Sequence, residues 1–149
     1  MAGDITLEIK GLDRIIKNFS KSSGIVREYT SKAIRSAELF LKDTARKEVP
    51  FKTGRLQKSI QVLSQTQPFS GGITATAKYA AAVEFGSSPH KITAKGGGLS
   101  DGKTFFGKSV MHPGTKANPF MQRTADSKKE LVERIFTDAA EKIANELTK

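Results

Sequence analysis

The chain has 149 residues, enough for a domain with its own hydrophobic core, and it carries a formal charge of +10 at pH 7. It contains no cysteine, which excludes disulfide bonds and thiolate metal sites. No apolar run approaches the ~18 residues of a membrane span, and the first residues do not read as a secretory signal, so we expect a protein made in a cytoplasm with no membrane partner.

The positive charge is unevenly distributed along the chain. Residues 1–60 carry 13 basic and 7 acidic side chains, residues 61–118 carry 6 and 2, and residues 119–149 carry 6 of each. A positive surface attracts nucleic acids, anionic membranes or acidic proteins, and its sign does not choose among them. Because the sequence contains no recognisable motif for sequence-specific DNA binding, the charge supports at most non-specific contact with DNA.

The first half of the chain reads as a strand followed by two helices. Residues 4–10 alternate between apolar and polar side chains, which is typical of a half-buried strand. Helical spacing of apolar residues then predicts a short helix over 12–19 and a long central helix over 25–48. Pro50 ends the long helix, because proline lacks an amide hydrogen and disfavours helical angles at the preceding residue.

The segment from Val49 to Ile60 reads as a helix end followed by a capped turn. Thr53 is the predicted cap, and Gly54 tolerates the backbone angles that such a turn demands. Leu56 and Ile60 lie four residues apart and share one face. The segment is interpreted as structural and not as a chemical site.

The second half begins with a predicted hairpin. Residues 59–66 and 71–78 are rich in β-branched residues and flank a turn at 68–72. Residues 79–85 are ambiguous between a strand end and a helical turn, and the run of three alanines favours the turn. The last helix begins at Asn118-Pro119 and keeps one apolar face to the end of the chain.

Residues 87–118 are the least regular part of the chain and are rich in Gly, Ser, Lys and Pro. A loop of this length in a small domain is usually functional or disordered. We expect 92–94 to pair with 104–111 in an extended β-arm with Gly96–Gly98 at its tip, mobile in the free protein and ordered against a partner. The predicted fold is therefore α+β: a single domain over 1–149, whose small, mostly antiparallel sheet is packed by the long central helix and the C-terminal helix.

Four patterns suggest chemical sites, and each has a structural explanation that we prefer. Gly97–Thr104 and Gly102–Ser109 both fit the phosphate-loop pattern. The segment before them is short and polar, which argues against a buried strand there, and the segment after them is interrupted by glycine, which argues against a helix. His90 and His112 would meet at the base of the arm but lack the further ligands of a zinc site. The serines lack a nucleophile elbow, and Glu84 reads as a structural carboxylate and not a general base. We therefore expect no enzyme activity and no cofactor.

Three motifs in a fixed order suggest a family. The first is V-P-F-K-T-G-R-L-Q-K-S-I at 49–60, the second is Tyr79-Ala80-x-x-Val83-Glu84-Phe85-Gly86, and the third joins His112-Pro113-Gly114-Thr115 to Asn118-Pro119-Phe120-Met121. Together they resemble a tailed-bacteriophage family of small tail components, the gene-ten-like group of head–tail joining or tail-completion proteins. The structural motif positions are Pro50, Thr53, Gly54, Leu56, Ser59, Tyr79, Val83, Glu84, Phe85, Gly86, Pro119 and Phe120.

The resemblance implies a structural virion protein of the phage neck or tail that acts by protein–protein association as a ring. Its implied partners are head-completion or adaptor subunits and tail-tube or tail-terminator subunits, with the free protein a monomer. It also implies that Val83 and Phe85 lie in the core, Glu84 near the surface, and Gly86 where a side chain would be strained. Phe105, Phe106 and Met111 would be apolar interface anchors, with Lys95, Lys103 and Lys108 around them. The alternative function is a basic protein that binds DNA non-specifically.

Overall fold

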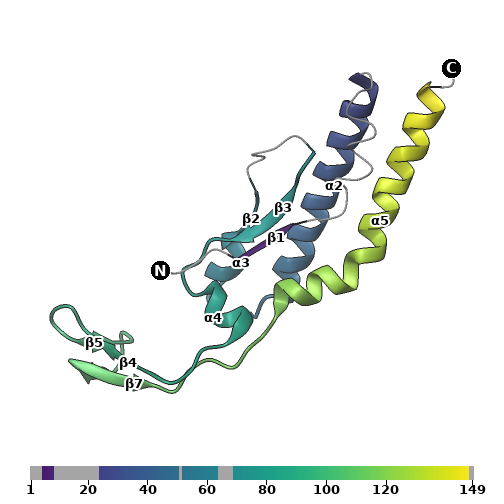
Figure 1. Ribbon diagram of the computed structural model, residues 1–149. Helices are drawn as coiled ribbons and strands as arrows, with labels where there is room; N and C mark the ends of the chain where they lie inside the picture. Colours follow the sequence, from purple (N-terminus) through teal and green to yellow (C-terminus); the bar gives the residue numbers. More distant parts are fainter. Residues whose placement is uncertain (1–4, 9–23, 51, 64–68, 148–149) are drawn as a thin grey trace. The chain divides into compact units, whose positions relative to one another are not determined.

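The computed structural model describes residues 5–8, 24–50, 52–63 and 69–147 (Figure 1). They form two compact units, a helix–sheet unit (1–80 and 120–149) and an arm unit (81–119). The predicted helix over 12–19 lies outside the described residues. Within the described ranges, no helix is both long enough and apolar enough to span a membrane.

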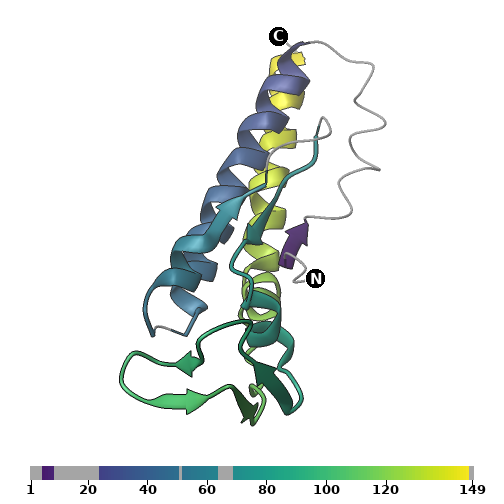
Figure 2. The same cartoon turned by 90° about the vertical axis from the view of Figure 1, so that its left-hand side faces the viewer.

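Two long helices dominate the helix–sheet unit. Helix α2 (Gly24–Glu48) and helix α5 (Phe120–Leu147) run antiparallel and lie side by side in both Figure 1 and Figure 2. Each contributes an apolar stripe at helical spacing to the shared core. The buried side chains include Val26, Ala33, Ile34, Ala37, Leu41 and Ala45 from α2, and Phe120, Met121, Val132, Ala139 and Ile143 from α5.

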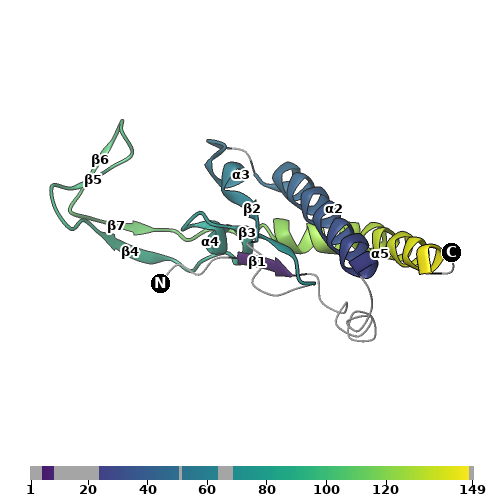
Figure 3. The same ribbon diagram turned by 90° about the horizontal axis from the view of Figure 1, so that it is seen from above.

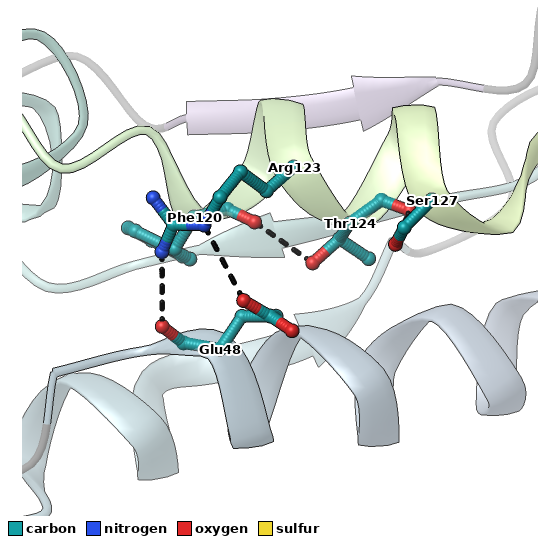
Figure 4. A network of polar contacts seen from close by, with 5 residues as sticks. All are labelled: Glu48, Phe120, Arg123, Thr124 and Ser127. Atoms are coloured by element: carbon teal, nitrogen blue, oxygen red, sulfur yellow. Dashed lines mark hydrogen bonds and ion pairs between the residues drawn. The ribbon is translucent and has the colours of Figure 1, made fainter.

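The ends of these two helices are joined by polar contacts near the start of α5 (Figure 4). Arg123 Nε lies 3.3 Å from Glu48 Oε2, and Arg123 Nη2 donates to the Glu48 carbonyl oxygen at 3.3 Å. One turn inside α5, the hydroxyl of Thr124 donates to the Phe120 carbonyl at 2.8 Å. This bond satisfies a hydroxyl that is completely buried, as its position in the core requires.

A three-stranded antiparallel sheet in the order β1-β3-β2 packs on α2. It comprises β1 (Ile5–Glu8), β2 (Ile60–Val62) and β3 (Gly72–Ala75). Both outer strands pair with β3, with Ile5 and Ile60 each opposite Ala75. All four residues of β3 are buried, so the central strand lies inside the core. The predicted α+β class is confirmed, although the strands also include two separate ladders in the arm unit.

The turn between α2 and β2 follows the sequence with one correction. Helix α2 ends at Glu48, confirming the effect of Pro50, and the short helix α3 (Arg55–Ser59) carries buried Leu56 toward Ile60. The predicted Thr53 cap is wrong, because the residue before α3 is Gly54, which has φ 71° and no side-chain bond at the cap. The left-handed angle that glycine allows replaces the hydroxyl cap.

Arg46 connects the end of α2 to α3 and β2. Its Nη2 donates to the Ile60 carbonyl at 2.9 Å, while its own carbonyl accepts from Gln57 Nε2 at 3.0 Å. Ser59 closes α3 by donating its hydroxyl to the Leu56 carbonyl at 2.7 Å. The first sequence motif is therefore a corner that brings α2 onto the edge of the sheet.

A buried carboxylate fixes the start of β3 on α2. Glu38 is 1% exposed, and its Oε1 accepts the Gly72 backbone N–H at 3.2 Å. Its Oε2 lies 3.7 Å from Nη1 of the solvent-exposed Arg35. The approach is close: a Cβ on Gly71 would lie 2.5 Å from Ile34 Cγ2 and 2.7 Å from Glu38 Oε1. The backbone at 71–72 can reach α2 only because glycine occupies position 71.

We predict that Glu38→Ala lowers the free energy of unfolding by about 2–3 kcal/mol, because the buried Gly72 amide loses a charged acceptor. Arg35→Ala, which removes only the exposed partner, should cost less than about 0.5 kcal/mol. Urea denaturation followed by circular dichroism measures both values. Equal losses in the two variants would contradict the role assigned to the Glu38–Gly72 bond.

Candidate interaction surface

The arm unit is built from two short antiparallel ladders. Strand β4 (His90–Thr93) pairs with β7 (Ser109–His112), and β5 (Leu99–Ser100) pairs with β6 (Phe105–Gly107) (Figure 3). The first ladder is extended by the Ala94 N–H, which donates to the Lys108 carbonyl at 2.9 Å. The predicted pairing between Ile92 and the returning strand is confirmed, with Val110 as its partner.

The predicted tip of the arm is wrong. Gly96–Gly98 connect β4 to β5, and the chain reverses instead at 101–104, so Phe105 pairs with Ser100. Asp101 builds this turn: its Oδ1 accepts the N–H groups of Lys103 at 2.9 Å and Thr104 at 2.7 Å. The bonds from Thr104 and then Lys103 hold the pKa of the Asp101 carboxyl below its ordinary value. Sequence reasoning missed this because an aspartate turn competes with a glycine run as the point of reversal.

Backbone hydrogen bonds join the two ends of the arm, at its root, and we call this set of bonds the clasp. Ser87 and Thr115 exchange two hydrogen bonds, N–H to carbonyl, at 2.9 and 3.1 Å, and the Asn118 N–H donates to the Val83 carbonyl at 2.7 Å. Gly86 has φ 78°, and a Cβ there would lie 2.9 Å from the Thr115 carbonyl oxygen. The expectation that a side chain at Gly86 would be strained is confirmed.

His90 and His112 face each other at the base of the first ladder. They are paired in register, and their rings stack with centroids 5.0 Å apart. His90 Nδ1 lies 2.9 Å from the Ser88 carbonyl, whereas His112 Nδ1 accepts the Gly114 N–H at 3.1 Å. The predicted proximity is confirmed, and each ring already has a backbone partner. Among the described residues, no three potential metal ligands gather into one cluster.

The two segments that match the phosphate-loop pattern form strands and turns. The pattern over Gly97–Thr104 leads into β6, and the pattern over Gly102–Ser109 leads into β7. A phosphate loop needs a helix directly after it, so that backbone amides and the helix dipole converge on the phosphates. Neither copy has that context, and the pattern here reflects only a segment rich in Gly, Lys and Ser.

The arm exposes apolar side chains and buries none. No residue from 87 to 118, a range described throughout, is buried. Phe105 is 69% exposed, Phe106 43% and Met111 66%. The three predicted lysines, Lys95, Lys103 and Lys108, are exposed as well. In the β4–β7 register Met111 lies opposite the exposed Lys91, so an apolar and a cationic side chain share one face of the ladder.

The sequence-based placement of Glu84 and Phe85 is wrong. Both end helix α4 (Ala80–Phe85), but Glu84 is buried and Phe85 is 74% exposed. The spacing explains the exchange: Ala80 and Glu84 are four residues apart and share the buried face, so the next position turns away from it. Val83 is half-buried and Tyr79 exposed. The same i, i+4 spacing could have identified Phe85 as an exposed apolar residue in the sequence.

One comparison with known proteins gives a match. Residues 13–86 fit the model of the HK97-gp10-like family, described as "Bacteriophage HK97-gp10, putative tail-component". The chain belongs to the HK97-gp10-like family. None of the curated proteins and none of the solved structures compared matches it.

Membership in the HK97-gp10-like family gives the chain a structural role in the phage virion, as a tail component that contacts other virion proteins. The matched range contains the corner at 49–60 and the motif that ends in Gly86. It stops at Gly86, directly before the arm, which begins at Ser87. The family match therefore covers α2, α3, β2, β3 and α4, and it includes neither β1, α5 nor the arm.

We predict that Gly114→Ala opens the clasp. Gly114 has φ 91°, and a Cβ there would lie 2.3 Å from the Ser87 carbonyl oxygen. Gly102 has nearly the same φ, 92°, with nothing within 4 Å, so Gly102→Ala is a control with equal backbone strain and no clash. Amide hydrogen exchange at Thr115 should lose about 1–3 kcal/mol more protection in the first variant. Equal protection in both would show that the clash is relieved elsewhere.

The tip turn should depend on pH through Asp101. Because the folded-state pKa is depressed, the carboxylate stabilises the turn above the unfolded value of about 3.9, and this contribution is lost as the pH falls through the folded pKa. NMR shifts of the Lys103 and Thr104 amides should therefore be flat above pH ~5 and move below it. Asp101→Asn, which keeps an acceptor oxygen, should hold the turn without the pH dependence. Amides that titrate at or above the ordinary aspartate value would refute this.

Proposed function

We propose that this protein acts at the head–tail junction of the virion, as a head–tail joining or tail-completion subunit that assembles into a ring. On this proposal residues 1–149 work as one joining domain whose arm, 87–118, docks on a neighbouring subunit. The partners are head-completion or adaptor subunits on one side and tail-tube or tail-terminator subunits on the other. The mechanism is association, with no chemical step and no cofactor.

The observation that carries the proposal is the composition of the arm surface. Two-stranded ladders without a buried face are marginally stable in water, and the arm contains two of them. Its large apolar side chains Phe105, Phe106 and Met111 are exposed to solvent in the isolated chain. A partner that covers them would gain apolar burial and would order the ladders in the same step. Aromatic and Met side chains are also those enriched at the centres of protein interfaces.

The root of the arm suits the same role. The clasp between Ser87 and Thr115 fixes where both strands of the arm leave the root, and the glycines at 86 and 114 permit its close backbone contacts. A fixed root reduces the loss of conformational entropy on docking, because fewer residues have to be ordered on the partner. We therefore assign the mobile, partner-dependent part of the arm to 95–107, beyond the first ladder.

A second candidate is non-specific DNA binding, favoured by the charge of +10 and by the exposed arm lysines. It requires duplex DNA binding by the isolated protein that weakens steeply as the salt concentration rises. Binding of this kind would not need the exposed aromatic and Met side chains, which is why we rank it second.

The test of the proposed function is a triple variant, Phe105→Ser, Phe106→Ser and Met111→Ser. Heads and tails from a lysate that lacks the protein are mixed with the purified variant, and infectious particles are counted. We expect joining to fall roughly tenfold or more, because truncating anchors at an interface centre costs about 2 kcal/mol each. The thermal unfolding midpoint should stay near that of the wild type, since these side chains are not buried.

Leu39→Ser is the matched control, because Leu39 is an exposed apolar residue on α2 outside the arm. It should join heads to tails as the wild type does. Wild-type levels of joining by the triple variant would remove the arm from the mechanism. Equal losses in both variants would mean that exposed apolar residues act on assembly in general and not through the arm.

A further inference from the structure

We propose that the arm docks on an acidic surface of a different virion protein, and not on DNA or on a second copy of this chain. The inference rests on the proposed function, in which the arm is a docking element, and it adds the chemistry of the partner. Its basis is the distribution of charge and of exposed apolar side chains over 87–118.

The charge that the arm presents to a partner is mostly cationic, with five lysines and one aspartate. Its five lysines, all exposed, are Lys91, Lys95, Lys103, Lys108 and Lys116. Within the part of the chain that the structure describes, none of them forms an ion pair. The single acidic residue of the range is Asp101, and its Oδ1 is bonded to two amides of its own turn. Lysines without internal partners attract carboxylates from outside and speed the encounter with an acidic surface.

The apolar side chains decide between DNA and protein. Duplex DNA is bound non-specifically through its phosphates, and such contacts use lysines but leave exposed Phe and Met side chains in water. The Phe105 ring lies over the backbone at Gly98, where an added Cβ would stand 2.3 Å from Phe105 Cε2, and the ring is still 69% exposed. A protein interface with an apolar centre and a charged rim would use Phe105, Met111 and the lysines together.

A second copy of the chain is the wrong partner for these lysines. Residues 1–60 carry 13 basic against 7 acidic side chains, and residues 119–149 are balanced at 6 and 6. Within 1–60, Glu28 and Glu48 already have cationic partners, Lys32 and Arg123. Docking the arm on the 1–60 part of another copy would therefore bring like charges together, which costs affinity, and the balanced 119–149 part offers no net attraction. We infer that ring contacts between copies use other surfaces and that the arm reaches a protein of opposite charge.

The experiment compares two variants of equal net charge. The arm variant is K91Q/K95Q/K103Q/K108Q, and the matched variant is K47Q/K52Q/K58Q/K129Q, whose lysines are also exposed but lie outside the arm. Binding of each full-length protein to purified heads and to purified tails is measured by surface plasmon resonance at two salt concentrations. Fluorescence anisotropy with a duplex DNA and sedimentation velocity of the protein alone run in parallel.

We expect the arm variant to associate roughly tenfold more slowly with one of the two particles at low salt, and to lose most of the salt dependence, while the matched variant behaves as the wild type. DNA binding and self-association should respond equally to both variants. The inference is overturned if the two variants lose particle binding equally, if only DNA binding depends on the arm lysines, or if the arm variant alone changes self-association.

The same measurements separate this inference from the proposed function. A wild-type protein that binds neither heads nor tails refutes both. A wild-type protein that binds one particle, with the arm variant binding as fast, refutes only the acidic partner and leaves the docking role of the arm to the apolar variant described above.

Discussion

The contact on which the helix–sheet unit depends is the bond between the buried Glu38 carboxylate and the Gly72 amide. It joins the middle of α2 to the first residue of the central strand, at a point where only glycine at position 71 lets the two backbones approach. A carboxylate in an apolar core is costly unless it is bonded, so the bond is specific as well as stabilising. Strand β3 pairs with both β1 and β2, so fixing β3 on α2 fixes the sheet.

The arm unit follows the opposite principle. Local interactions hold it together instead of a hydrophobic core: an aspartate turn at the tip, two short ladders, a stacked imidazole pair and the backbone clasp at the root. Each interaction is worth little by itself, and none buries an apolar side chain within 87–118. An element built in this way keeps its connections while leaving its side chains available to another molecule. That is the property expected of a docking segment in a virion component.

Much of the scaffold could be predicted because its signals are local. The period of apolar residues gave α2 and α5, and Pro50 gave the end of α2. The alternation in the hairpin gave β2 and β3, and the expected return of 104–111 onto 92–94 gave the pairing at the base of the arm. For the helices and for β2 and β3, the deciding pattern lies within one segment or in two neighbouring segments, so the residues themselves carry the information.

The sequence alone determined the α+β class, the order of the long elements and the motifs of the HK97-gp10-like family. Tertiary structure decided two things: that Glu38 is a core residue, and that Phe85 is exposed while Glu84 is buried. Both depend on which element comes to lie against which face. The reversal at Asp101 is a local turn, but the glycine run at 96–98 offered a competing point of reversal. A charged residue becomes buried only when a distant backbone amide such as that of Gly72 arrives to bond it. Distances of this kind are set by packing between segments far apart in the chain, and no local pattern of residue types records them.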